Sequence, residues 1–461
     1  LFFIMNRFGL YRLPCYRASV LPWIILAFAA INVIFLGGKR RAFGSFVAQF
    51  HKEYPNISLT ELNWIGDSYS AIGYMSTSLS ISIIIYFNRR YGLFQFLGAL
   101  WVLISCITSS FVPNPHWLFL THTLFHGIGS SLIISTAGLV VNEYFDKKHR
   151  YHILATTLVS GGSVASILFV MLFSFLIQKY TWEGALQILG VLYFIVCGCA
   201  AIFFRKNLDL KEVSSTGKSK YSCQTYIRWK NIPLLILWFV DRVLTSVVTY
   251  GILLNLTTHS YEKHYSLVDS SISTVLFASG EASTYLIGAI IMAITKDLFK
   301  ERLRYVLLVT SFTMCASLIL IYFFEANKTV LRSLLFVAGF SLGPSITFLF
   351  PAGEELTRLP GHVAYPFSLG GMGFGMMISP LLTAKIIELY NFQMFFLVQG
   401  GLIGIKFVCL LLILIILFFW QNKIDLLNRS ISISNSKNYL ENGLTDDETV
   451  SILKRSINGS Y

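Results

Sequence analysis

The chain has 461 residues, of which 55% are hydrophobic and only 13% are charged, and its mean hydropathy is +0.65. These values are far from those of a soluble globular domain and predict an integral membrane protein in a lipid bilayer. The net charge of +13 is interpreted as attraction to an anionic inner leaflet, so no nucleic acid is expected as a partner.

Twelve segments are long and apolar enough to cross a bilayer, whose hydrocarbon core needs roughly 20 apolar residues per helix. Their apolar runs are continuous and lack the strict alternation of membrane-barrel strands, so the sequence predicts an all-α membrane protein. The twelve predicted transmembrane helices cover residues 21–50, 62–87, 92–112, 116–142, 151–178, 182–204, 231–258, 268–295, 303–325, 329–352, 361–389 and 392–420.

A polar stretch that includes DLKEVSSTGKSK divides these helices into two sets of six. Because the chain begins with Leu1 and not Met, whether its N-terminus is complete is left open. The predicted parts are a cytoplasmic N-terminal segment (1–20), an N-terminal six-helix bundle (21–204), a cytoplasmic linker (205–230), a C-terminal six-helix bundle (231–420) and a cytoplasmic tail (421–461).

Lys and Arg residues set the predicted orientation, because they are enriched in cytoplasmic loops. Most of the 36 Lys and Arg residues fall on the side that would hold both termini and the linker, so both termini are predicted to be cytoplasmic. The sequons at Asn56 and Asn327 then fall in outer loops and are predicted glycosylation sites. Those at Asn428 and Asn458 fall inside and are expected to stay unmodified.

The stretch VVNEYFDKKHRYHILATTLVSGGSVASILF places a charge cluster, residues 146–150, directly before a helix of small side chains. The charges agree with an inner loop between the fourth and fifth predicted helices. Small residues let helix backbones approach closely where lipid supplies no hydrophobic driving force. We interpret the fifth helix as an interior, packed helix; a merely flexible glycine-rich helix is the alternative.

Part of this stretch, YFDKKHRYHILATTLVSGGSVAS, resembles the monocarboxylate transporter family, solute carrier family 16 of the major facilitator superfamily. Further similarity lies in RAFGSFVAQF with SLTELNWIGDSYSAIG, in FNRRYGLFQFLGALWVLISCITSSF, in YTWEGALQILGVLYF and in ISPLLTAKIIELYNF. The resemblance covers most of residues 21–420 and is stronger in the first half. It departs at the start of the first helix, VLPWIILAF, and in the eighth helix, which lacks the Arg that family members commonly carry.

The resemblance implies the major facilitator superfamily fold, in which two six-helix bundles surround a central cavity that opens alternately to each side. It also implies a secondary-active or facilitative transporter in the plasma membrane. The expected substrate is a small organic anion that bears a monocarboxylate, with proton symport as one option and an accessory membrane glycoprotein as a partner to be considered. Substrate identity, proton coupling, direction and oligomeric state are left open.

Other classes of membrane protein fit less well. The sequence has no G-x-S-x-G, HExxH or paired intramembrane aspartates that would indicate an enzyme, and the helix count excludes a seven-helix receptor. No ATP-binding P-loop occurs, and no cofactor is expected. A non-transporting sensor or scaffold on the same fold is the alternative that stays open, because fold does not fix function.

Ionisable residues within membrane helices are costly and are default candidates for a substrate or proton pathway. Lys39, Arg40 and Arg41 interrupt the first predicted helix. Arg41 stands where the family places a basic residue before FG, so the resemblance implies that it binds a substrate carboxylate through charge-assisted hydrogen bonds. In the alternative, all three mark the outer end of a shorter helix and extend to the headgroups, which fits Lys39 better than Arg41.

The C-terminal bundle contains three further candidates. Asp241 and Arg242 are neighbours in the seventh helix, and because adjacent side chains point about 100° apart, each is expected to pair elsewhere, in a structural salt bridge or a transport role. Glu281 lies near the middle of the eighth helix, where the family carries charge. It is a candidate proton carrier or partner for Arg41, with structural hydrogen bonding as the alternative.

His122 and His126 are four residues apart and share a face of the fourth helix. We expect either a protonatable site in the cavity or buried, hydrogen-bonded histidines. A zinc site would need a third ligand that the sequence does not offer, so no metal site is predicted.

The resemblance also implies an inner gate, which the basic loop between the second and third helices holds closed in the superfamily. Positive-inside topology alone would also place arginines in this loop. The predicted gate residues are Asn88, Arg89, Arg90, Asp146, Lys147 and Arg150.

Overall fold

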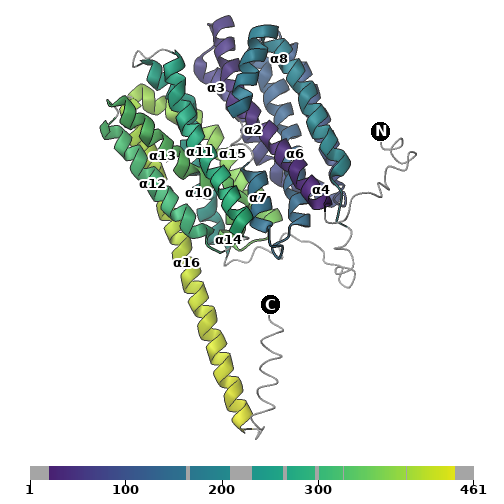
Figure 1. Cartoon of the computed structure of the whole chain (residues 1–461), viewed down its shortest axis with the longest axis vertical. Helices are drawn as coiled ribbons and strands as arrows, with labels where there is room; N and C mark the ends of the chain where they lie inside the picture. The colour runs from purple at the N-terminus through teal and green to yellow at the C-terminus, as the bar shows by residue number, and fades with distance from the viewer. Residues whose placement is uncertain are drawn as a thin grey trace, which may run out of the picture. The chain divides into compact units, whose positions relative to one another are not determined.

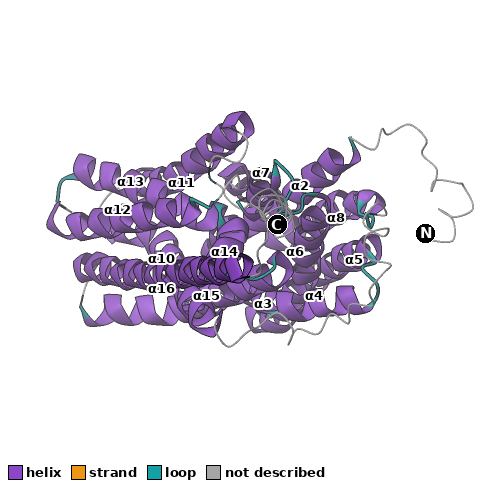
Figure 2. Cartoon of the chain, turned by 90° about the horizontal axis from the view of Figure 1, so that it is seen from below, coloured by secondary structure: helices purple, strands orange, loops and turns teal. Residues whose placement is uncertain are grey.

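The computed structural model describes residues 20–161, 167–207, 231–262, 267–295, 299, 301–324, 326–390 and 392–441. Within these ranges the regular elements are helices and no strand forms, which confirms the predicted all-α class (Figure 2). The first 19 residues, most of the predicted linker and the last 20 residues lie outside the described residues. So do some side chains within described helices, that of Arg41 among them.

Helices fill both predicted bundles (Figure 1). The first set is α2 (Leu21–Glu53), α3 (Leu59–Met75), α4 (Thr77–Tyr86), α5 (Tyr91–Ser110), α6 (Phe125–Tyr144), α7 (His152–Ser160) and α8 (Ile167–Phe203), with the short turns η1 (Pro115–Trp117) and η2 (Phe119–Leu124) before α6. The second set is α10 (Ile232–Glu262), α11 (Leu267–Thr295), α12 (Leu303–Phe324), α13 (Lys328–Thr347), α14 (Leu349–Thr357), α15 (Gly361–Leu389) and α16 (Phe392–Glu441).

Ten of the helical segments in the described ranges are, each by itself, long and apolar enough to cross a membrane. The other two predicted spans, 62–87 and 151–178, are interrupted. The first is divided at Ser76 into α3 and α4. The second begins as the short helix α7 and continues into α8.

Two more boundaries follow from local backbone geometry. α8 contains a kink at Tyr180 and Thr181, and the φ of 61° at Thr181 separates the fifth from the sixth predicted span. The tenth predicted span is divided at Phe348, four residues after Pro344, whose ring removes a backbone donor from α13.

Small residues allow close helix packing, as the sequence predicts. A Cβ added to Gly339 on α13 would lie only 2.0 Å from the carbonyl oxygen of Phe277 on α11, so these two backbones are nearly in contact. The prediction of an interior fifth helix is confirmed for α7. Its residues are buried except Leu158, and the Ser160 hydroxyl donates to the Thr347 carbonyl of α13 at 2.5 Å.

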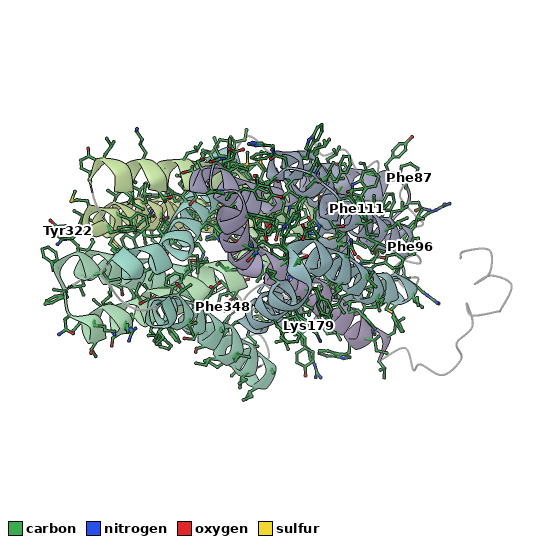
Figure 3. The ribbon with its side chains drawn as sticks, turned by 90° about the horizontal axis from the view of Figure 1, so that it is seen from above. Phe87, Phe96, Phe111, Lys179, Tyr322 and Phe348 are labelled. Atoms are coloured by element: carbon green, nitrogen blue, oxygen red, sulfur yellow. The ribbon has the colours of Figure 1, made fainter. Side chains whose placement is uncertain are left out.

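Large apolar side chains remain exposed on the outer surface, where a bilayer would cover them. In Figure 3 the exposed Phe87 and the half-buried Phe96 lie at the margin of the first helix set and the half-buried Tyr322 at the margin of the second, whereas the buried Phe348 lies toward the middle. Two large buried apolar clusters lie inward of this surface, one drawn from residues 25–204 and one from residues 248–403, and a smaller third cluster contains Leu235, Leu359 and Ala364.

Contacts divide the chain into two units, residues 1–410 and 411–461, and the buried charged clusters lie in the first. α16 runs from Phe392 to Glu441 and therefore has residues in both units. It also continues past residue 420, the predicted end of the last transmembrane helix. The boundaries of the predicted bundles, linker and tail stay predictions.

Candidate functional site: buried charges and an inner gate

Lys39 and Arg40 lie within α2 and are buried, with 0% and 8% of their surfaces exposed. The alternative that they extend to the lipid headgroups is therefore wrong for these two residues. The reason is that α2 continues through them to Glu53, so they face protein and not the end of a helix. The side chain of Arg41 is not among those described, and its predicted role stays a prediction.

The Lys39 ammonium lies inside the first helix set. Its Nζ is 3.2 Å from Nδ1 of His126 on α6 and 3.6 Å from Sγ of Cys106 on α5. It also lies over the ring of Tyr69, 5.5 Å from the centroid. Because like charges repel strongly in a low-dielectric interior, Lys39 and His126 are not expected to be positively charged at the same time.

His122 lies in η2, a π-helical turn that precedes α6. Such turns are rare and are frequent at functional sites. The His122 ring stacks on that of His126 with 5.3 Å between centroids and 7° between planes. Neither ring nitrogen of His122 has a hydrogen-bond partner among the described residues. The two histidines therefore share a face, as their spacing predicts, and both are buried. The absence of hydrogen bonds from the described residues to His122 leaves its ring capacity for a proton or a ligand.

Arg40 links the two helix sets. Its Nη1 donates to the Tyr74 hydroxyl of α3 at 2.7 Å, and its guanidinium lies 4.9 Å from the ring centroid of Tyr250 on α10. Its Nε has no acceptor among the described residues. Nearby on α3, the carboxylate of Asp67 interacts electrostatically with Arg40, and Asp67 Oδ2 also has no hydrogen-bond partner there.

Asp241 and Arg242 are both fully buried in α10, and they pair with each other. Arg242 Nε donates to Asp241 Oδ2 at 2.7 Å, and Arg242 Nη2 contacts the same oxygen. The two residues were expected to pair elsewhere, but the long arginine side chain reaches back across the 100° separation and contacts its neighbour through one carboxylate oxygen. Arg242 also stacks on Trp238, 4.0 Å from the ring centroid.

Arg242 also finds a partner elsewhere, as expected, since its Nη1 donates to the Ser345 carbonyl of α13 at 2.6 Å. Lys406 on α16 donates to the hydroxyl of the same Ser345 at 2.6 Å and is fully buried. Glu281 is fully buried in α11. Both roles predicted for Glu281, as a proton carrier and as a partner of Arg41, stay predictions.

A second group of charges lies where α7 meets α14, which lie side by side (Figure 1). His152 Nε2 on α7 is 2.9 Å from Glu354 Oε2 on α14, and His152 Nδ1 is 2.7 Å from the Phe145 carbonyl. Lys147 Nζ lies 3.7 Å from the other Glu354 oxygen. On α14, burial raises the pKa of Glu355, the residue after Glu354. This cluster joins the two helix sets at the predicted cytoplasmic side.

Beside this cluster is a cavity of about 180 Å³, lined by Arg89, Tyr91, Glu143, Asp146 and His362 among others. Glu143 contacts several groups around this cavity. It accepts hydrogen bonds from the Tyr91 hydroxyl at 2.5 Å and from the Asn207 backbone N–H at 2.9 Å, and Arg89 Nη1 lies 3.5 Å from its carboxylate.

The structure brings together part of the predicted gate. Asn88 and Arg89 adopt positive φ in the turn between α4 and α5, and Asn88 accepts from Lys206 at 3.4 Å. Asp146 Oδ1 accepts from two backbone N–H groups of its own loop. Arg90 and Arg150 are exposed, and Arg150 lies over the ring of Tyr151.

Both predicted glycosylation sites are exposed at turns. Asn56 lies between α2 and α3. Asn327 caps α13, where its Oδ1 accepts from the backbone N–H groups of Thr329 and Val330 and leaves Nδ2, the glycan-bearing atom, outside these bonds. Whether either carries a glycan stays a prediction, and Asn458 lies outside the described residues.

Sequence reasoning missed several residues of these clusters. Asp67 and Lys406 are intramembrane charges, and the rule that selected Glu281 would have selected them too. His152 and Glu354 are 202 positions apart, and no local pattern could pair them. Cys106 and Glu143 can be recognised as parts of these clusters only from the side chains that contact them in the structure.

The sequence profile of the Major Facilitator Superfamily matches residues 23–364, well over half of the chain. The chain belongs to the Major Facilitator Superfamily. This superfamily member is also similar to monocarboxylate transporter 12 of Homo sapiens, at 25% identity over 203 residues, 44% of this chain and 38% of the relative. It is 28% identical to monocarboxylate transporter 9 of Gallus gallus over 144 residues, 30% of this chain and 27% of the relative. The resemblance that its motifs indicated is confirmed.

The matched stretches span well under half the length of these curated relatives. Among solved structures, the human organic anion transporter MFSD10 (TETRAN) aligns with a TM-score of 0.58 at 13% identity, over 85% of this superfamily member and 97% of that chain. This alignment confirms the predicted fold. The charged clusters described above therefore lie within a major facilitator fold.

Proposed function

We propose that this chain is a carrier that moves a small organic carboxylate across a membrane by alternating access of its two bundles, without chemical conversion of the solute. The expected setting is the plasma membrane, with both termini cytoplasmic. The observation that carries the proposal is the buried guanidinium of Arg40, which contacts Tyr74 of one bundle and Tyr250 of the other. A carboxylate bound there would be held from both bundles.

The physical case rests on unsatisfied hydrogen bonding. A buried donor that lacks an acceptor costs about 1–3 kcal/mol, and the Nε of Arg40 is such a donor among the described residues. A carboxylate offers only acceptors and a guanidinium offers only donors, so the two are complementary. Arg41, the next residue, is proposed to add a second cationic contact from α2.

Proton coupling is a further part of the proposal. Lys39, which precedes Arg40 in α2, forms a connected buried group with His126 and His122. Two positive charges side by side repel each other in this buried group. A proton bound to one of its side chains would therefore be released readily when a second side chain of the group becomes positively charged. The alternative, a purely structural role for the two histidines, predicts no dependence of uptake on the proton gradient.

The test is uptake into cells or proteoliposomes of labelled monocarboxylates and amino acids at two external pH values. The proposal expects saturable uptake of at least one carboxylate, competed by its unlabelled form. Failure of every carboxylate in the panel, with correctly folded protein, would remove the carrier proposal. Equal uptake at both pH values would remove proton coupling alone.

A further inference from the structure

We propose that closing the inner gate takes up one proton, which is held between His152 on α7 and Glu354 on α14, so that acidity on the cytoplasmic side favours the closed gate. We call these two residues the gate pair. The inference rests on the proposed alternating access of the two bundles and on the predicted orientation. It goes beyond them because it adds a response to cytoplasmic pH that requires no transported solute.

The two contacts of the His152 ring determine where its protons lie. Its Nδ1 is 2.7 Å from the Phe145 carbonyl oxygen, which only accepts hydrogen bonds, so Nδ1 carries a hydrogen and donates. In a neutral imidazole the other nitrogen, Nε2, would then hold a lone pair and no hydrogen. Nε2 lies 2.9 Å from Glu354 Oε2, and a lone pair and a carboxylate oxygen would repel each other at that distance. The contact therefore holds a proton, shared between the imidazole and the carboxyl group.

Burial makes this proton a property of the closed gate. The side chains of His152 and Glu354 are only 7% and 5% exposed, so water replaces neither partner. An unpaired carboxylate is costly in such a place, whereas an imidazolium and a carboxylate form a charge-assisted hydrogen bond. When the bundles separate, both groups meet water, where at neutral pH the carboxylate is ionised and most of the imidazole is neutral. Closing the gate is thus coupled to the uptake of one proton.

Lys147 decides which partner holds the proton. Its Nζ lies 3.7 Å from Oε1 of Glu354, the oxygen that His152 does not contact. A nearby ammonium favours the ionised form of a carboxyl group. The shared proton is therefore expected on His152, and the closed gate contains an imidazolium, a carboxylate and an ammonium in a row.

Other ionisable groups surround the gate pair and must be separated from it in a test. They are Asp146, Lys148, His149 and Arg150 in the loop before α7, Arg89 before α5, Glu143 on α6, Glu355 on α14, Arg358 after α14, Arg304 on α12 and His362 on α15. The helices α2, α10 and α11, which pack against α7 or α14, also carry Lys39, Arg40, Asp241, Arg242 and Glu281.

The carboxylates among these neighbours accept hydrogen bonds from other groups. Glu143 accepts from the Tyr91 hydroxyl and Asp146 from backbone N–H groups of its own loop. Glu355 accepts from the Arg304 backbone N–H at 3.3 Å. Two histidines titrate in the same pH range as His152 and are its rivals as the source of a pH response, His149 and His362.

The direction of the effect follows from proton linkage. The closed gate binds one proton more than the open gate at neutral pH, so its population rises as the cytoplasmic pH falls and is lost as the pH rises. A single linked proton changes the ratio of closed to open states by at most about tenfold per pH unit. An acidic cytoplasm would hold the gate closed and slow the delivery of solute into the cell.

The experiment measures the gate itself, in the purified full chain in lipid nanodiscs and without solute. Nitroxide labels on Lys148→Cys and Arg302→Cys, two exposed positions before α7 and α12, report the distance between the two helix sets by pulsed electron paramagnetic resonance. Native cysteines that react with the label are first replaced by Ser. Distances are compared at about pH 6 and about pH 8, on either side of the range in which imidazole titrates.

The labelled chain is compared with His152→Gln and Glu354→Gln, and His149→Gln is the matched control, a histidine three positions before His152. Thermal unfolding of each variant establishes that it is folded. His152→Gln removes the titrating ring. In Glu354→Gln the carboxamide N–H donates to the neutral imidazole, so the contact needs no added proton.

In the wild type, the population with the shorter distance should grow about tenfold or more, relative to the open population, between about pH 8 and about pH 6. His152→Gln and Glu354→Gln should each reduce this response to less than about twofold, because neither pair takes up the linked proton. His149→Gln should keep the response of the wild type.

Three results would overturn the proposal: equal distances at both pH values in the wild type, a full pH response in folded His152→Gln and Glu354→Gln, or a response that is lost in His149→Gln or His362→Gln and kept in His152→Gln. Because the labels report without solute, each of these results leaves the carrier function to be judged on the uptake panel. Failure of every carboxylate in that panel would remove the carrier function without changing the measured distances.

Discussion

A hydrogen bond of 2.9 Å between His152 on α7 and Glu354 on α14 joins the two helix sets at the predicted cytoplasmic side. Both side chains are buried, and Lys147 adds a second, longer contact to the same carboxylate. Alternating access requires that such a connection break in each cycle, because a permanent link would keep one side closed.

The first prediction concerns this gate. In the double variant His152→Cys and Glu354→Cys, a short bis-methanethiosulfonate cross-linker, which joins the two thiols through disulfide bonds, should reduce uptake more than about tenfold, and a reducing agent should restore it. The two single variants, treated in the same way, serve as controls for the native cysteines. Full transport by the cross-linked double variant would show that these helices do not separate during the cycle.

The second prediction is topological. With both termini inside, glycosidase-sensitive modification should occur only at Asn56 or Asn327 and should disappear in the corresponding Gln variants. A protease added outside intact cells should cut neither the termini nor the 205–230 linker. A glycan on Asn458 would reverse the predicted orientation.

The third prediction concerns Arg41. Arg41→Ala should weaken uptake about ten- to a hundredfold without loss of surface protein, because a charge-assisted contact contributes about 1.5–3 kcal/mol. Arg41→Lys should keep part of the binding but lose bidentate geometry. Lys179→Ala, which alters an exposed cation at the kink of α8, is the control (Figure 3). Unchanged uptake by Arg41→Ala at subsaturating substrate would exclude Arg41 from the site.

The fourth prediction concerns helix packing. Gly339→Ala should destabilise the fold by about 1–3 kcal/mol, because its Cβ would meet a backbone carbonyl that cannot move aside. Gly401→Ala is the matched control, since nothing lies within 4 Å of its added Cβ. Thermal unfolding in detergent should separate the two variants by several degrees, and equal melting temperatures would contradict the close approach of α11 and α13.

Much of the fold is predictable from the sequence because membrane helices need long apolar runs, and the helix ends at residues 21, 295 and 389 agree with prediction. The breaks at Ser76 and Phe348 were not predicted, because hydropathy continues through both. His122 and His126 share a helical face by spacing alone, whereas the pairing of Asp241 with Arg242 depends on how far a flexible side chain reaches. Lys39 and Arg40 could not be separated from headgroup-facing residues until the burial of α2 was known.

The most direct test of the carrier function is the number of solute molecules moved per protein molecule in sealed proteoliposomes. With L-phenylalanine or 3-phenylpropanoate as labelled probe, a carrier predicts many molecules taken up per protein, with faster entry when unlabelled solute is preloaded inside. Uptake that saturates at about one molecule per protein and is unchanged by preloaded solute would contradict the carrier function and indicate a sensor on the same fold.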